Sequence, residues 1–164
     1  MTLRIIRESQ RRKTGLFEWT VQAVRQGGLP AIALFSFHVI AALGFDAYAH
    51  FPPLDVPMHF LGGVVIAYFF HHAAIAACNC GIIGAFHRTT HTVLVFALAC
   101  AATVFWEFAE FVADRLFETR AQLGLEDTLG DMFLGVCGGI AFISIGCHFS
   151  ALRLCLTKQP RNPQ

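Results

Sequence analysis

Hydrophobic residues gather into four long runs along the chain, and polar segments separate these runs. They cover about residues 30–48, 56–77, 92–112 and 128–149. A helix needs about 20 consecutive apolar residues to cross the hydrocarbon core of a bilayer. Because such a run can satisfy its backbone hydrogen bonds in lipid only as a helix, the pattern predicts an all-α integral membrane bundle of four transmembrane helices.

Composition favours a membrane protein over a soluble one. Hydrophobic residues make up 55% of the 164 residues and charged residues only 14%, whereas a soluble domain carries about 25% charged residues. A net charge of +1, without a basic stripe among aromatics, argues against a nucleic-acid binder. The expected partners are therefore the lipid bilayer and, within it, a second membrane protein or another copy of this chain.

The basic segment before the first run has two interpretations. Phe17, Val21 and Val24 recur at helical spacing, which is typical of an interfacial helix lying on the membrane. A solvated basic arm is the alternative, and Gly27 and Gly28 are expected to end the segment. The chain is accordingly divided into a basic cytoplasmic arm or interfacial helix (1–28), a four-span membrane domain (29–152) and a cytoplasmic tail (153–164).

Positive charge is distributed unevenly between the two sides of the predicted bundle. With the N-terminus inside, ten of the twelve Lys and Arg residues fall in cytoplasmic segments, and the outer loops hold only Arg115 and Arg120. Cytoplasmic loops of membrane proteins carry such an excess of Lys and Arg. We therefore expect both termini in the cytoplasm.

The basic leader and the first run together also resemble a signal peptide. The leader is long for that role, so an uncleaved anchor is favoured.

Each of the last three runs carries a pair of ionisable residues about one turn from its outer end. The pairs are Asp55/His59, Glu107/Glu110 and Asp127/Asp131. Spacings of three or four residues keep both members of a pair on one helix face, and an ionisable group at this depth is a functional-site hypothesis by default. We expect the pairs to meet in one pocket beneath the outer surface. For Asp55 and Asp127, N-capping is an equal alternative.

Glycines in the second and fourth runs predict close contacts between these helices. Small residues let membrane helices approach each other closely, and the candidates are Gly62, Gly63, Gly130, Gly135, Gly138 and Gly139. Trp106 lies beside Glu107 and is expected to be an interfacial aromatic with a polar tip.

Five carboxylates around one imidazole favour a bound cation. They cannot all stay ionised together without a cation or protons to offset their like charges. Oxygen ligands with one imidazole suit a hard or borderline divalent metal ion such as Mg, Mn, Ca, Fe or Zn. The candidate metal ligands are Asp55, His59, Glu107, Glu110, Asp127 and Asp131.

In an enzyme, a metal held by His59, Glu107 and Asp131 would activate water. Glu110 or Asp127 would then be the general base.

A second group of metal-ligand residue types lies toward the cytoplasmic side. Its members are His71, His72, Cys78, Cys80, His87 and His91. Zinc or copper would suit such ligands, but the CxC spacing is not that of the usual knuckle, so loop and core roles are the default. His38 and His148 are expected to be packed or interfacial. The chain has no GxSxG, P-loop, HExxH or Rossmann glycine motif, which removes the usual support for those enzyme classes.

Three blocks of the sequence resemble YjdF-type bacterial inner-membrane proteins and, more loosely, the VanZ-like family. They are DVPMHFLGG from Asp55, WEFAEF from Trp106 and DTLGDM from Asp127. The resemblance implies a small multi-pass protein of the bacterial inner membrane whose polar residues form the family signature. VanZ-like members are associated with glycopeptide (teicoplanin) resistance, which implies envelope chemistry.

We therefore expect a polar site at the extracytoplasmic face that binds or processes an envelope lipid or glycan precursor with the help of a metal ion. Two alternatives remain open. One is a non-catalytic membrane subunit that packs against a partner complex. The other is a proton- or cation-handling protein, in which a carboxylate–histidine network meets the same electrostatic need without a metal.

Overall fold

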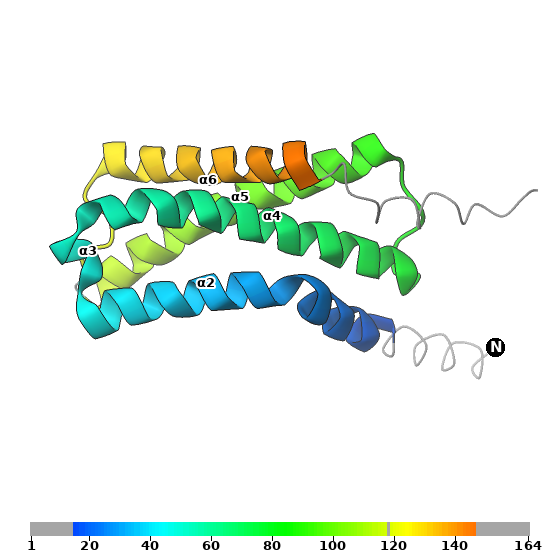
Figure 1. The fold of residues 1–164 in the computed structure, drawn as a ribbon, viewed down its shortest axis with the longest axis horizontal. Coiled ribbons are helices and arrows are strands. Elements are labelled where there is room, and N and C mark those ends of the chain that lie inside the picture. Colours follow the sequence, from blue (N-terminus) through cyan, green and yellow to red (C-terminus); the bar gives the residue numbers. More distant parts are fainter. Residues whose placement is uncertain (1–14, 118, 147–164) are drawn as a thin grey trace, which may run out of the picture.

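The structure of the protein is a computed structural model that describes residues 15–117 and 119–146. Within them, four helices are long and apolar enough to cross a membrane, and they lie side by side (Figure 1). Their ranges are Gly15–Gly44, Pro52–Asn79, Arg88–Phe117 and Leu125–Ile145. The predicted all-α bundle of four spans is confirmed. Residues 1–14, the tail 153–164 and the predicted end of the fourth span at 149 lie outside the described residues.

The first span is one continuous helix, and the predicted break at Gly27 and Gly28 is wrong. Residues 15–23 are helical and are followed by η1 (Val24–Gly28, π-helical), α2 (Leu29–Val39) and η2 (Ile40–Gly44, π-helical). A Cβ added at Gly27 would lie 2.9 Å from the Cβ of His72 and 3.1 Å from the Cα of Phe69. The glycines therefore allow a close helix contact instead of ending a helix. Figure 1 shows the span bending near η1, as π-helical turns commonly cause.

The segment expected to lie on the membrane packs against the second span. The Trp19 indole N–H donates a 2.9 Å hydrogen bond to the Ala73 carbonyl, and the Tyr68 hydroxyl donates one of 3.3 Å to the Gln26 carbonyl. Residues 15–26 are thus continuous with the first span and tied to the second, rather than lying apart from the bundle.

A tight reversal leads from the first span into α4 (Asp55–Asn79). It contains Asp46 in a left-handed conformation (φ 49°), then α3 (Ala47–His50) and the 3-10 turn η3 (Pro52–Leu54). The predicted N-cap role of Asp55 is wrong, because the N-cap residue is Leu54 and no side chain caps the helix. Asp55 is instead the first helical residue. Its carboxylate there faces the positive end of the helix dipole and is free to contact other side chains.

The remaining helices, α5 (Arg88–Phe117) and α6 (Leu125–Gly146), pack beside α4. A Cβ added at Gly63 would fall onto the carbonyl oxygen of Gly135, and one at Gly138 would fall onto the facing backbone of α4. These glycines confirm the predicted close contact between the second and fourth spans. The prediction is wrong for Gly62 and Gly130, which have no other atom within 4 Å of an added Cβ.

The centre of the bundle is apolar, and its polar groups lie toward the two ends. Ala67, Val95 and Ala99 are at most 1% exposed and form a buried cluster between α4 and α5. We call the end that carries α3 and the 119–124 loop the site end (Figure 1). The starts of α4 and α6 and the end of α5 meet there, so the three predicted pairs of ionisable residues lie at this end.

Candidate functional site

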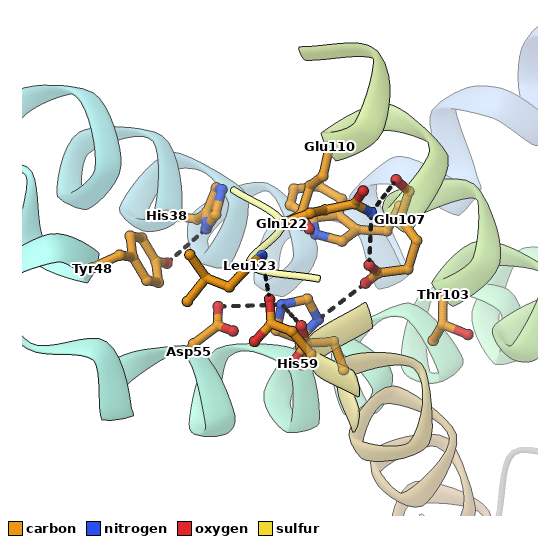
Figure 2. A network of polar contacts seen from close by, with 12 residues as sticks. His38, Tyr48, Asp55, His59, Thr103, Glu107, Glu110, Gln122 and Leu123 are labelled. Carbon is orange, nitrogen blue, oxygen red and sulfur yellow. Dashed lines mark hydrogen bonds and ion pairs between the residues drawn. The ribbon is translucent and has the colours of Figure 1, made fainter. Parts of the chain in front are cut away.

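His59 of α4 lies at the centre of the predicted pocket at the site end (Figure 2). Its Nε2 atom is 3.3 Å from Asp55 Oδ1 and 3.8 Å from Asp131 Oδ2. Its Nδ1 atom is 3.8 Å from Glu107 Oε1. One imidazole thus lies among carboxylates from α4, α5 and α6, as the spacing of the pairs predicts.

Glycine packing fixes the distance between the two helices that carry His59 and Asp131. Gly63 follows His59 by four residues, and Gly135 follows Asp131 by four residues. On a helix, this spacing places each glycine one turn deeper on the same face. The backbone contact between the two glycines therefore holds the imidazole and the carboxylate close together one turn above it.

Most of these side chains are removed from solvent. The exposed fractions are 10% for His59, 5% for Glu107 and 9% for Asp131, whereas Asp55 is 31% exposed. The Oε1 atom of Glu107 is buried without a hydrogen-bond partner. Leaving a buried polar atom unsatisfied costs about 1–3 kcal/mol, so a cation or a proton at this atom would stabilise the site.

Glu110 joins the site through the indole of Trp106. The Trp106 N–H donates a 2.7 Å hydrogen bond to Glu110 Oε1. The expected polar tip of this tryptophan therefore contacts the site directly. Its bond occupies one carboxylate oxygen of Glu110 and leaves the other available.

The structure brings five of the six predicted ligands into two overlapping sets. Asp55, His59 and Asp131 form one set, and His59, Glu107 and Glu110 form the other. Within each set, the potential ligand atoms all lie within 4.8 Å of one another. Because both sets contain His59, a metal ion on either side of the imidazole would have one nitrogen and two carboxylate ligands.

Asp127 is the sixth predicted ligand, and it belongs to neither set. Its Oδ2 atom accepts a 2.9 Å hydrogen bond from the backbone N–H of Leu123, four residues earlier. The carboxylate thus stabilises the chain just before α6. This is close to the capping alternative, although Asp127 is the third residue of α6 and not its N-cap.

The loop between α5 and α6 covers the site, which the sequence does not reveal. The Gln122 side-chain amide donates hydrogen bonds to the Glu107 carbonyl (3.0 Å) and to Glu107 Oε2 (3.3 Å). Asp114 holds this loop by accepting hydrogen bonds from the backbone N–H groups of Ala121 and Gln122 and from the Thr119 hydroxyl. Loop residues follow no helical period, so no spacing links Gln122 to Glu107.

His38 also lies beside the site instead of standing alone. Its Nδ1 atom and the Tyr48 hydroxyl share a 2.6 Å hydrogen bond, visible in Figure 2. Burial, together with the negative charges of Asp55 and Glu110, raises the pKa of Tyr48 to about 12. The phenol therefore keeps its proton at neutral pH. The position of Tyr48 just after the first span, at the same end as the acidic pairs, was the available sequence signal.

At the opposite end, the second predicted cluster is only partly assembled. The ring centroids of His71 and His91 are 4.8 Å apart, and those of His71 and His72 are 5.1 Å apart. Among the described residues, no three potential ligand atoms of this cluster lie within 4.8 Å of one another. His91 is fully buried, with both ring nitrogens unpartnered, which agrees with the default role of a core residue. His148 lies outside the described part of the chain.

Comparison with known proteins assigns this chain to a family. The family described as "Predicted membrane protein (DUF2238)" matches residues 16–151. YjdF-type proteins belong to this family, whereas this match does not show the looser VanZ-like resemblance. No curated protein and no solved structure matches the chain. Because the match extends over nearly all of the four spans and over every predicted pair, the chain belongs to the DUF2238 family of predicted membrane proteins.

Proposed function

We propose that the site end binds a divalent metal ion through His59 and the surrounding carboxylates, and that the ion holds the phosphate-bearing headgroup of an envelope lipid or glycan precursor. The observation that carries this proposal is the pair of ligand sets that share one imidazole. Each set combines two carboxylates and a ring nitrogen from at least two helices. Ionisable groups inside a membrane protein cost free energy, so their convergence on one point indicates a functional site.

Electrostatic repulsion supports a cation at this site. Two carboxylates whose oxygens lie within 4.8 Å of each other repel by at least about 3 kcal/mol at an effective dielectric constant of about 20. The two pairs are Asp55 with Asp131 and Glu107 with Glu110. One member of each pair is nearly inaccessible to water, since Glu107 is 5% and Asp131 9% exposed, and this limits solvent screening. A divalent ion would replace this repulsion with attraction and would also satisfy the orphan oxygen of Glu107.

The ligand types favour particular ions. Carboxylate oxygens suit Mn²⁺, Mg²⁺ and Ca²⁺, whereas an imidazole adds affinity for Zn²⁺ and Fe²⁺. Mn²⁺ accepts both ligand types and is the natural probe. A bound ion of this kind supplies Lewis acidity toward a phosphate or lowers the pKa of a bound water. Asp55 is 31% exposed, so a headgroup would reach the ion from its side.

For a catalytic site, we propose Glu110 rather than Asp127 as the general base. When His59, Glu107 and Asp131 hold the ion, Glu110 lies beside it and keeps one oxygen free of the Trp106 bond, so that oxygen can accept a proton. The Asp127 carboxylate accepts the Leu123 N–H, so it is already engaged in the loop. Glu110 is therefore the general base that we propose.

A proton or cation relay through the bundle has weaker support. Such a relay needs polar groups that continue from the site end to the opposite end. Among the described residues, the buried cluster of Ala67, Val95 and Ala99 separates His59 from His71 and His91. The polar groups thus form two separate groups rather than one path.

The distribution of charge supports the orientation of the site. We propose that the protein lies in the bacterial inner membrane with its termini in the cytoplasm. The positive-inside bias of the sequence supports this orientation, in which the site end faces the extracytoplasmic side and its envelope precursors.

A titration of the purified full-length chain with Mn²⁺ tests the metal proposal. Electron paramagnetic resonance of the free ion measures how much Mn²⁺ is bound. Glu107→Gln and Asp131→Asn should each weaken binding by at least about tenfold, which corresponds to about 1.4 kcal/mol. Asp46→Asn is the matched control, because Asp46 is an exposed acid at the same end and Asn tolerates its left-handed backbone. Equal binding by all four proteins, or none by the wild type, would refute the proposal.

A further inference from the structure

An apolar cavity lies directly beneath the acidic site. It is walled by α2, α4, α5 and α6. Its volume of about 260 Å³ is just below the range of roughly 300–1,000 Å³ that is usual for ligand pockets. Its apolar wall includes Leu34 and Phe35 of α2 and Val65 and Ile66 of α4. A wall of this kind favours an apolar occupant.

The cavity and the acidic site share residues. His59 lines the cavity and also contacts the carboxylates of Asp55, Asp131 and Glu107. Trp106 lines the cavity with its ring while its N–H bonds to Glu110. With a cation at the acidic site, a molecule with an apolar tail and an anionic head would therefore occupy both spaces at once.

We propose that this cavity holds one hydrocarbon chain of a phosphate-bearing lipid, with its phosphate at the acidic site. This inference rests on the proposed metal function, because the ion supplies the attraction for the phosphate. It adds the class of ligand, a membrane lipid rather than a free glycan or nucleotide. The two sources of such a ligand are a diacyl phospholipid and a polyprenyl phosphate, which share this chemistry.

The depth of the cavity fits a chain that continues from the site into the bilayer. Val65 and Ile66 follow His59 by six and seven residues on α4, which corresponds to about 10 Å along a helix. The cavity is too narrow for a helix of another protein, which is about 10–12 Å wide. A single flexible chain is the occupant that its volume admits.

Aromatic contacts join α2 and α5 beside the cavity. The Trp106 ring bridges these helices through edge contacts with Phe35 (5.9 Å) and His38 (5.2 Å). A second hollow along α5 shares Ala102 and Trp106 with the cavity. The two hollows thus adjoin along α5, so a chain that extends from the first hollow into the second would pass Trp106.

Photo-cross-linking tests this proposal with the full-length chain in vesicles of phosphatidylethanolamine and phosphatidylglycerol. One arm contains phosphatidylglycerol with a diazirine in one acyl chain, and the other contains a polyprenyl phosphate with a diazirine in its chain. In at least one arm, cross-links should concentrate at Leu34, Val65 and Ile66 relative to lipid-facing Phe133, which is 67% exposed. The arm that gives them identifies the source of the lipid.

Two variants fill the cavity from opposite walls. Ala31→Phe fills it from α2, and Gly62→Leu fills it from α4, where an added Cβ meets no other atom within 4 Å. Both should abolish the cavity cross-links, whereas Ala33→Phe on the exposed face of α2 should keep them. Cross-links spread evenly over lipid-facing residues in both arms, or cavity cross-links that survive both fillings, would overturn the proposal.

Mn²⁺ binding by the same proteins separates this inference from the proposed metal function. Gly62→Leu should lose the cavity cross-links and retain Mn²⁺ binding, because it changes no ligand. Wild-type Mn²⁺ binding without cavity cross-links would refute the lipid inference alone. Cavity cross-links without Mn²⁺ binding would refute the metal function and the role of the ion in holding the phosphate.

Discussion

At the residue scale, some polar atoms of the site end already have hydrogen-bond partners, and others have none. Asp127 and Asp114 accept hydrogen bonds from the loop backbone, and one oxygen of Glu110 accepts the Trp106 N–H. By contrast, Glu107 Oε1 has no hydrogen-bond partner, and it faces His59 at 3.8 Å. The atoms without partners converge on the imidazole, so a cation would meet its ligands there.

Tyr48 should remain protonated far into the alkaline range. Burial, and then the charges of Asp55 and Glu110, raises its pKa to about 12, compared with about 10 in an unfolded chain. The Tyr68→Phe variant leaves Tyr48 as the single tyrosine, and its tyrosinate absorbance should appear near pH 12. A transition near pH 10 in the folded protein would place the phenol in water.

The same shift predicts how stability depends on pH. Between about pH 10 and 12, the folded chain keeps a proton that the unfolded chain releases. The contribution of Tyr48 to the free energy of unfolding is therefore complete below about pH 10 and declines as pH rises through this window. Tyr48→Phe should make the alkaline loss of stability, measured by thermal unfolding, smaller than in the parent protein.

His91 should be replaceable by an apolar ring. It is fully buried, both of its ring nitrogens lack partners, and it stacks on Phe86 with ring centroids 5.4 Å apart. Because an unsatisfied buried group costs about 1–3 kcal/mol, His91→Phe should leave the Tm unchanged or raise it. A lower Tm accompanied by loss of copurified zinc or copper would instead show that these nitrogens are ligands.

At the scale of helices, spacing predicts the spans and the acidic pairs because both follow the helical period. It cannot decide between the two uses of glycine. Gly27 and Gly28 suit a helix end as well as a close contact, and the partner surface around Phe69 favours the contact. Likewise, only the rotation of α4 about its axis decides that Gly63 faces α6 while Gly62 faces the cavity.

Two glycines on α6 should respond in opposite ways to the same substitution. Gly138→Ala places a Cβ on the backbone of α4, so it should separate the helices and lower the Tm. Gly130→Ala meets no other atom within 4 Å and should be neutral or stabilising by about 0.5–1 kcal/mol, because alanine is the better helix former. Thermal unfolding in one detergent compares the two variants, and equal effects would contradict the packing of α4 on α6.

At the scale of the whole molecule, the helices are longer than the apolar core of a bilayer. Helices of 25 and 30 residues extend about 38 and 45 Å, compared with about 30 Å of hydrocarbon. Their ends therefore reach into the headgroup region. His59 is the fifth residue of α4, whereas Glu107 lies ten residues before the end of α5. The acidic site is therefore set inside the ends of the helices, and the apolar cavity continues from it toward the middle of α4.

The orientation of the bundle can be measured with single cysteines. In a variant without the six natural cysteines, Ala49→Cys marks the site end and Gly84→Cys marks the opposite end, and both positions are exposed. A membrane-impermeant maleimide added to intact bacterial cells with permeabilised outer membranes should label the cysteine at 49 and not the one at 84. The reverse pattern would place the site on the cytoplasmic side.

Anomalous X-ray scattering from crystals of the full-length chain grown with Mn²⁺ would locate an ion at the site end. We expect a manganese peak beside the His59 ring, in contact with carboxylate oxygens of Glu107 or Asp131, that disappears in the Glu107→Gln/Asp131→Asn double variant. A map without manganese between α4, α5 and α6 at the site end, obtained at ion concentrations that saturate binding in solution, would contradict the metal proposal.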